Sequence, residues 1–244
     1  MRIAALTAAL MTAAPLAAQD APVAPAVLRA VQEATISAQI SGLIEELPFQ
    51  DGAAFAAGDV LARFDCARIE AEAEAARATF RAAEEVRSTT ARLARLGDIG
   101  KGEDRRAAAE AEAAAASANA LETVVGDCEI RAPYAGRVVA RLVNPFETLE
   151  AGQEIISIVG TDRPRVELIV PSVWLRWLRE GQQFSVVINE VEATVPARID
   201  RIGAAIDPVS RTVRVTGSLT SDAADRIRLL PGMSGSARFP DPNG

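Results

Sequence analysis

Apolar and polar residues alternate along two stretches of the chain that repeat each other. Each stretch carries two glycines 16 residues apart, and the second copy begins 94 residues after the first. An apolar residue stands 13 positions after the first glycine of each copy, and another stands 19 positions after it. The matching residues are Gly42, Phe55, Gly58 and Leu61 in the first copy, and Gly136, Leu149, Gly152 and Ile155 in the second. Because the alternation has the period of a β-strand, the pattern predicts two halves of one small β domain.

The sequence between the two copies has the composition and the apolar spacing of two long helices. Ala, Glu and Arg, which favour helix strongly, dominate residues 65–96 and 103–125. Gly97–Gly102 holds three glycines in six residues and predicts a turn. Small or apolar residues recur at spacings of three and four, at Cys66, Ile69, Ala73, Ala76, Phe80 and Ala83, and then at Ala107, Ala111, Ala114, Ala118, Leu121, Val125 and Cys128. We therefore expect an antiparallel coiled-coil hairpin about 45 Å long.

After residue 161 the strand pattern returns, and one short helix interrupts it. Short strands are predicted by apolar runs at 165–170, 184–188, 193–202, 212–219 and 234–239. Ser172–Glu180 predicts a helix with Ser172 as its N-cap, ended by Gly181. We expect the strands to close into a small barrel, with Trp174 and Trp177 covering one end of it.

The N-terminus has the features of an export signal. Met1 and Arg2 precede an apolar run over Ile3–Leu16, and small residues follow up to Ala18. The run is shorter than the roughly 20 residues that a membrane-spanning helix needs. It predicts a secretory signal peptide cleaved after Ala18, with retention as an anchor left open. The expected boundaries are a signal peptide at 1–18, a flexible tail at 19–26, a split β domain at 27–64 and 129–160, the hairpin at 65–128, a barrel at 161–240 and a tail at 241–244.

Charge and composition exclude several classes of function. The formal net charge is −7 and no basic run appears, so nucleic-acid binding is not expected. The chain has no histidine, which removes the usual general base and the commonest metal ligand. Gly100 and Gly102 lie between predicted helices rather than after a strand, so they do not form a nucleotide-binding loop. We expect no enzymatic activity, no metal and no cofactor.

Cys66 and Cys128 lie at the outer ends of the two predicted helices. In an antiparallel hairpin those ends are neighbours, and an exported protein folds in an oxidising compartment. Counted from the middle of the predicted turn, Cys66 lies about five residues further out than Cys128, which is roughly 8 Å of helix. Uncertain helix ends can absorb that difference. A disulfide is favoured, and a buried pair of free thiols is the alternative.

Several segments resemble one known family. Ile130–Val138 reads IRAPYAGRV and opens the second β copy. Ile199–Val215 carries an Ile-Asp-Pro-x-x-Arg-Thr-Val pattern, and Leu230–Met233 looks like a closing barrel strand. The residues of that barrel signature are Asp207, Pro208, Arg211 and Thr212. Over nearly all of its mature length the chain is similar to the HlyD-type periplasmic adaptors, or membrane fusion proteins, and in particular to periplasmic adaptor subunits of RND efflux transporters.

The resemblance implies a mainly β fold with a long antiparallel α-helical hairpin, a split biotinyl/lipoyl-like β domain and a small β-barrel domain. It implies a short form of the family, without an evident membrane-proximal domain. The family's lipoyl-like domain carries no cofactor. A true carrier domain needs a modifiable lysine on the β domain, whereas Lys101 is the only lysine here and lies in the predicted helical turn. This argues against the competing interpretation as an acyl or biotin carrier.

The resemblance further implies a non-enzymatic adaptor in the periplasm, associated peripherally with the inner membrane. Family members link an inner-membrane transporter to an outer-membrane channel in tripartite efflux or secretion systems, and they assemble into a ring. A transporter of the RND class is favoured over one of the ABC class. A periplasmic scaffolding or regulatory protein that kept the fold but lost channel docking remains an alternative.

The hairpin tip is where the family typically docks on the channel, through Arg-x3-Leu-x6-Ser. One alignment places Thr89, Leu93 and Gly100 at these positions, the other places Arg92, Leu96 and Glu103, and neither supplies the serine. Apolar residues at an exposed tip call for a partner, unless they pack on each other to seal the hairpin end. The candidate docking residues are Leu93, Leu96, Ile99, Gly100 and Lys101.

Overall fold

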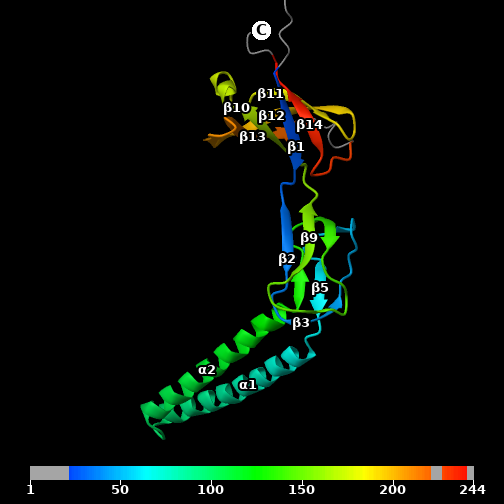
Figure 1. The fold of residues 1–244 in the computed structure, drawn as a ribbon. Helices are drawn as coiled ribbons and strands as arrows, with labels where there is room; N and C mark the ends of the chain where they lie inside the picture. Colours follow the sequence, from blue (N-terminus) through cyan, green and yellow to red (C-terminus); the bar gives the residue numbers. More distant parts are fainter. Residues whose placement is uncertain (1–21, 221–226, 241–244) are drawn as a thin grey trace, which may run out of the picture. The chain divides into compact units, whose positions relative to one another are not determined.

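The computed structural model describes residues 22–220 and 227–240. The signal peptide expected at 1–18 and the tail expected at 241–244 lie outside those residues. The described chain forms two compact units, one with the split β domain and the hairpin over Val31–Asp162, the other with the barrel (Figure 1). The expected fold class, mainly β with a long helical hairpin and a small β-barrel, is confirmed.

The split β domain consists of two sheets that share one apolar core. The sheets have the strand orders β2-β9-β7-β4 and β6-β5-β3-β8, so each contains strands from both halves of the repeat. The strands of the first half are β2 (Glu33–Ser37), β3 (Gly42–Glu46), β4 (Ala54–Phe55) and β5 (Val60–Phe64). Those of the second half are β6 (Glu129–Arg131), β7 (Gly136–Arg141), β8 (Thr148–Leu149) and β9 (Glu154–Gly160). Ile44, Ile155 and Ile158 lie in the core between the sheets and are fully buried.

The two halves correspond residue by residue at the offset of 94 that the sequence shows. The strands β2 to β5 correspond to β6 to β9, and the two sheets are exchanged by this correspondence. Equivalent hydrogen bonds recur: the N–H of Gly58 donates to the carbonyl of Ala132, and that of Gly152 donates to the carbonyl of Ala38, both at 2.8 Å. Both glycines have left-handed backbone, with φ of 87° and 91°, which glycine adopts without a steric penalty. The glycine spacing therefore reflects a true structural duplication.

The helices α1 (Ala67–Leu96) and α2 (Lys101–Gly126) pack against each other as an antiparallel hairpin (Figure 1). The predicted face of small residues supplies the buried positions on both helices, which are Ala73, Ala107, Ala111 and Ala118. Alanine allows the helix backbones to approach closely but buries little apolar area per residue. The turn is shorter than the expected 97–102, because Gly100 is the N-cap of α2, and Lys101 and Gly102 are already helical.

The barrel closes in the strand order β1-β10-β13-β12-β11-β14. Its elements are β1 (Val23–Arg29), β10 (Arg165–Pro171), the 3₁₀-helix η1 (Ser172–Arg176), β11 (Gln183–Ile188), β12 (Ala193–Asp207), β13 (Thr212–Leu219) and β14 (Ser234–Arg238). Inward-facing residues alternate along each strand and form one core, in which Val166, Leu168 and Val215 are fully buried. This alternation is the pattern that the sequence shows after residue 161.

Strand β1 corrects the boundaries expected from the sequence. Residues 19–26 were expected to form a flexible tail, and residue 27 was expected to begin the lipoyl-like domain. Instead, Val23–Arg29 completes the barrel, with Ala26 paired to Leu168 of β10 and to Gly235 of β14. Ala24, Ala26 and Leu28 are at most 3% exposed. The burial of this alternating face holds the strand in place, and its partners lie too far along the chain for a local pattern to reveal them.

Aromatic side chains cover one end of the barrel, as the sequence predicts for Trp174 and Trp177. Both indole rings pack against Phe239, with ring centroids 5.6 and 5.7 Å from it. The supporting helix differs from the prediction, because Ser172–Arg176 forms a single 3₁₀-helix and Pro171, rather than Ser172, holds the N-cap position. A segment this short satisfies few intrahelical hydrogen bonds, so packing of the indoles decides its conformation.

Candidate functional site

The predicted docking residues lie together at the tip of the hairpin. Gly97 ends α1 with a left-handed φ of 86°, and its N–H donates to the carbonyl of Ala94 at 3.2 Å. The N–H of Asp98 donates to the carbonyl of Leu93 at 3.1 Å. Gly100 then begins α2 with an extended backbone, at φ −77° and ψ 149°. These backbone caps reverse the chain within Gly97–Gly100.

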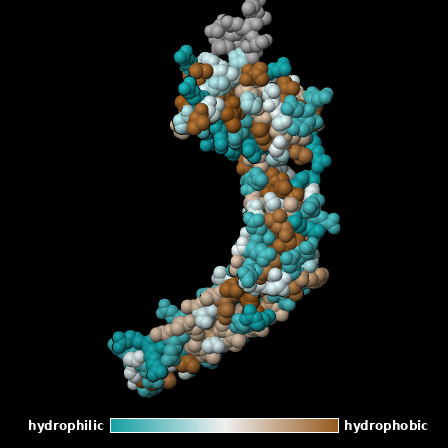
Figure 2. All heavy atoms as spheres, in the orientation of Figure 1, coloured by the Kyte–Doolittle hydropathy of each residue, from teal (hydrophilic) through white to brown (hydrophobic). Residues whose placement is uncertain are grey.

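The apolar side chains of the tip differ in exposure. Leu96 is 71% exposed, whereas Leu93 and Ile99 are half-buried. Lys101 is exposed and adds a positive charge at the start of α2. Figure 2 shows hydrophilic side chains over much of the visible face of the tip, with isolated apolar ones between them. Leu93 and Ile99 are thus partly covered within the hairpin, and Leu96 is the apolar tip residue that a partner can bury.

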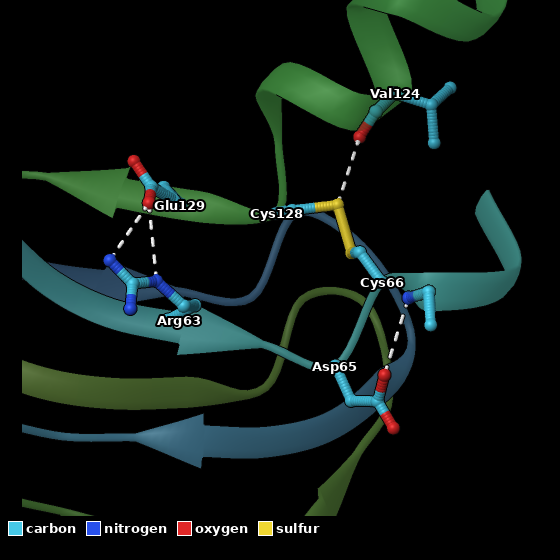
Figure 3. Close-up of a disulfide and its surroundings, with 7 residues drawn as sticks. Arg63, Asp65, Cys66, Val124, Cys128 and Glu129 are labelled. Atoms are coloured by element: carbon cyan, nitrogen blue, oxygen red, sulfur yellow. Dashed lines mark hydrogen bonds and ion pairs between the residues drawn. A yellow bond between two sulfur atoms is a disulfide. The ribbon is translucent and has the colours of Figure 1, made fainter. Parts of the chain in front are cut away.

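A disulfide joins the base of the hairpin. The Sγ atoms of Cys66 and Cys128 lie 1.99 Å apart, just before α1 and just after α2 (Figure 3). Both side chains are buried. The sulfur of Cys128 lies 3.7 Å from the carbonyl oxygen of Val124, in the last turn of α2. The bond therefore fixes the beginning of one helix to the end of the other where both join the β domain.

Arg63 connects strands beside this disulfide. Its Nη1 lies 3.1 Å from Glu46 Oε2. Its Nε donates to Glu129 Oε1 at 3.1 Å, as Figure 3 shows. The N–H of Ala67, the first residue of α1, donates to Asp65 Oδ1 at 3.2 Å. A surface hollow of about 670 Å³ opens here, and half of the residues that line it are charged, with both signs present. These ion pairs join β5 to its two neighbouring strands, β3 and β6, next to the point where the hairpin begins.

The turn between β12 and β13 holds the predicted barrel signature, Asp207, Pro208, Arg211 and Thr212. Asp207 Oδ1 accepts hydrogen bonds from the backbone N–H groups of Ser210 at 2.8 Å and Val209 at 3.0 Å. These bonds, led by those from Ser210, lower the pKa of Asp207 below its ordinary value of 3.8. Arg211 has a left-handed φ of 53°, and its N–H donates to the carbonyl of Asp207 at 2.9 Å. The signature therefore shapes a tight turn rather than a reactive centre.

Exposed apolar side chains gather around this turn. Ile169 and Ile206 line a hollow of about 440 Å³, together with Arg214 of β13 and residues in and beside the turn. The N–H of Ser172 donates to the carbonyl of Arg211 at 2.9 Å, which brings the start of η1 beside the turn. We define the barrel apolar patch as Ile169, Val173, Ile206 and Val209, which are 48%, 60%, 49% and 92% exposed. Such a group on a protein surface is typical of a contact site.

The titratable groups do not converge on a chemical centre. Across the hairpin, Arg77 Nε donates a hydrogen bond to Glu122 Oε1 at 2.7 Å, and this bond raises the pKa of Arg77. Within 22–220 and 227–240, no group of three or more Cys, Asp or Glu side chains is placed to hold a metal ion. In the same residues no helix has the length and apolar character needed to cross a bilayer.

Phe146 is an exposed aromatic residue that the sequence patterns do not single out. Phe146 is 77% exposed and has a left-handed φ of 66°, in the turn between β7 and β8. Strand alternation cannot reveal it, because it lies outside a strand. Continuing the alignment of the two repeat copies would have found it, since Phe146 corresponds to Gly52 at the offset of 94.

Comparison with known proteins gives one family match. The model of the RND MFP barrel-sandwich hybrid domain matches residues 32–161. This range covers more than half of the chain and coincides with the unit formed by the split β domain and the hairpin. The matched range therefore contains both halves of the duplication, β2 to β5 and β6 to β9.

Relatives and solved structures agree with this match. The nodulation protein NolF of Rhizobium meliloti (strain 1021) is 28% identical over 203 residues, which cover 77% of this chain and 55% of NolF. The chain thus spans about half the length of this curated relative.

Two solved structures have the same fold. A MacA–MexA chimeric protein with the Pseudomonas aeruginosa MexA α-hairpin domain has a TM-score of 0.78 and 20% identity, over 89% of this chain and 78% of the chimera. A putative efflux transporter from Bacteroides eggerthii DSM 20697 has a TM-score of 0.73 and 22% identity, over 94% of this chain and 73% of that one. At these identities the likeness establishes the architecture of hairpin, sandwich and barrel.

Proposed function

The chain belongs to the RND membrane fusion protein (MFP) family, and on this premise we propose that it is a periplasmic adaptor without enzymatic activity. In this role it links an inner-membrane transporter to an outer-membrane channel in a tripartite efflux or secretion system. The observation that carries the proposal is the match of the RND barrel-sandwich hybrid model to residues 32–161. The same match favours a transporter of the RND class over one of the ABC class.

We assign contact with the outer-membrane channel to the hairpin tip. Leu96 is the last residue of α1 and is 71% exposed there, five residues before α2 begins at Lys101. Burial of an exposed apolar side chain by a partner lowers the free energy of the complex, so an apolar residue at a narrow tip favours binding. Leu93 and Ile99 are half-buried, so their contribution is to shape the surface that presents Leu96.

We assign contact with the transporter to the barrel apolar patch. Val209 is 92% exposed at the apex of the β12–β13 turn, and Arg211 and Arg214 are exposed nearby. Aliphatic side chains flanked by arginine form the kind of surface that proteins bury in specific complexes. Asp207 supports the assignment because its hydrogen bonds fix the turn that presents Val209.

We propose that several copies assemble side by side into a ring around the transported substrate. A closed ring is the symmetric solution when every copy offers the same two lateral surfaces to its neighbours. No covalent cofactor is required in this role, and Lys101, the only lysine, is the first residue of α2 rather than part of the β domain. The expected location is the periplasm, with peripheral association to the inner membrane.

Photo-crosslinking in cells that carry the whole system tests the proposal. A photoreactive amino acid is placed at Leu96 or at Val209, with the exposed Glu112 on α2 as the control position. The expected adducts join position 96 to an outer-membrane channel and position 209 to an inner-membrane transporter, while position 112 gives neither. A chain that forms no adduct with either class of membrane protein would contradict an adaptor role.

A scaffolding or regulatory protein of the periplasm is the second candidate. It is favoured by the tip sequence, in which neither Gly100 nor Glu103 supplies the serine of the family's docking pattern. In that case position 209 still yields adducts with inner-membrane proteins, and position 96 yields none with a channel. The two crosslinking positions therefore separate the adaptor from the scaffold.

A further inference from the structure

The duplication of the β domain reveals an unusual residue. Gly52 and Phe146 occupy equivalent turns, and both have left-handed backbone, with φ of 79° and 66°. The N–H of Gly52 donates to the carbonyl of Val138 at 2.9 Å, and that of Phe146 donates to the carbonyl of Ile44 at 2.8 Å. The two turns thus have the same backbone role, one with glycine and the other with a large aromatic residue.

Neither backbone preference nor core packing explains the phenylalanine. Left-handed backbone is strained for residues with a side chain, and glycine avoids this strain, as in the equivalent turn at Gly52. The ring of Phe146 is 77% exposed, so it adds little to the core of its own domain. A strained conformation that presents an apolar ring to water points to a function for that ring.

The equivalent turn of the other half forms a surface that fits an aromatic ring. Apart from Gly52 itself and its two chain neighbours, no residue has an atom within 4 Å of the position that a Cβ would take at Gly52, so the backbone there is open to close approach. Arg137 is exposed and its Nη1 donates to the carbonyl of Gly52 at 2.9 Å, which holds the guanidinium beside the turn. A fixed guanidinium next to bare backbone can accept the face of an aromatic ring through a cation–π contact.

The two turns are attached to different sheets of the domain. The Phe146 turn is hydrogen-bonded to β3 in one sheet, whereas the Gly52 turn is hydrogen-bonded to β7 in the other. A head-to-tail ring brings two different surfaces of neighbouring copies together, so a projection on one surface needs a receptor on the other. The chain supplies both parts, with an aromatic projection and a cationic receptor.

We propose that Phe146 of one copy packs on Arg137 and Gly52 of the next copy. The partner of this surface is a second copy of the same chain. This inference rests on the proposed ring and deepens it, because it names the residues that meet between neighbours. The strain at Phe146 is then the cost of presenting an aromatic anchor at a position that otherwise favours glycine.

Substitutions of Phe146 test whether its side chain serves contact between copies or the stability of the fold. Phe146→Gly restores the residue type of the equivalent turn, so the melting temperature of the dilute protein should be unchanged or higher. Crosslinking between copies in cells should fall about tenfold or more, as expected when an interface anchor is removed. Phe146→Tyr retains the aromatic face and should retain the crosslinking. Equal crosslinking by Phe146→Gly and the unaltered protein would overturn the inference.

Arg137 provides the reciprocal test. Arg137→Ala should weaken self-association, and the combination with Phe146→Gly should add little further loss, because both changes remove the same contact. Fully additive losses would show that the two side chains do not meet.

Photo-crosslinking from position 146 identifies the partner directly. A photoreactive phenylalanine derivative there should give adducts with a second copy, mapped to the peptide around Gly52 or Arg137. An adduct with the transporter or the channel instead would overturn the inference while supporting the adaptor role. Absence of adducts at 146, with adducts present at 96 and 209, would overturn only the contact between copies. Absence at all three positions would count against the proposed function itself.

Discussion

Cys66 and Cys128 are covalently joined although 62 residues separate them in the sequence. The turn ends at Gly100 and α2 begins earlier than expected, which shortens the offset between the two cysteines from about five residues to about three, or roughly 4.5 Å of helix. Cys128 also lies beyond the end of α2 at Gly126, where the chain is no longer helical. The non-helical chain around Cys128 therefore takes up the remaining offset, and the two cysteines meet at the base of the hairpin.

Removal of the disulfide should destabilise the unit that contains the hairpin. Closing a loop of this length restricts the unfolded chain, and the double variant Cys66→Ala/Cys128→Ala should lose about 4 kcal/mol of unfolding free energy. Urea unfolding of the oxidised protein and of the variant measures the difference. The reduced protein is the matched control, because it keeps both side chains and should lose a similar amount. Recovery of two alkylated thiols from protein isolated without reductant would contradict the bond.

Substitutions at the hairpin tip should affect channel crosslinking and unfolding free energy differently. Leu96→Ser changes a side chain that is 71% exposed, so the unfolding free energy should stay within about 0.5 kcal/mol. Crosslinking of the tip to a channel should nevertheless be lost. Ile99→Ser is the comparison, since Ile99 is half-buried and its replacement should lower stability measurably. If Leu96→Ser lowers stability as much as Ile99→Ser, then Leu96 serves to seal the hairpin end.

Features that repeat within the chain were predictable from sequence. Gly58 and Gly152 occupy left-handed turns, where other residues are strained, so their spacing marks the same structure twice. The face of small residues on the helices was equally visible, and it includes the fully buried Ala73. In the first case the left-handed backbone requires glycine, and in the second the helical period requires small residues on one face. Both requirements involve only residues that are close in the sequence.

Features that depend on distant partners were not predictable in this way. Val23–Arg29 is a barrel strand because β10 and β14 flank it, and both lie far away in the sequence. The alternation of Ala24, Ala26 and Leu28 is present, but small residues and Pro25 make its signal weak. Phe146 was missed for a related reason, since the exposure of a turn residue depends on what packs around it.

The barrel signature should respond to pH in a defined direction. Hydrogen bonds from Ser210 and Val209 lower the pKa of Asp207 below 3.8, so the ionised carboxylate stabilises the folded state. This stabilisation is complete above 3.8 and is lost as the pH falls from there through the folded-state pKa. Unfolding of the unaltered protein and of Asp207→Asn should differ by a constant amount near neutral pH, and the two curves should converge in acid. A difference that does not change with pH would show that the carboxylate charge is not involved.

The duplication supplies a matched pair for testing the packing of the β domain. A Cβ added at Gly136 would lie 2.3 Å from the carbonyl oxygen of Val159 and 2.7 Å from Cζ of Phe55. At Gly42, the equivalent position, the nearest atom is Cδ1 of Phe64 at 3.5 Å, which is an ordinary contact. Because a paired backbone cannot yield as a flexible side chain can, Gly136→Ala should cost about 2 kcal/mol or more of unfolding free energy. Gly42→Ala should change it by less than about 1 kcal/mol, since it limits the unfolded chain without a clash. Urea unfolding of the two variants decides the point, and equal losses would mean that the two halves pack alike at this position.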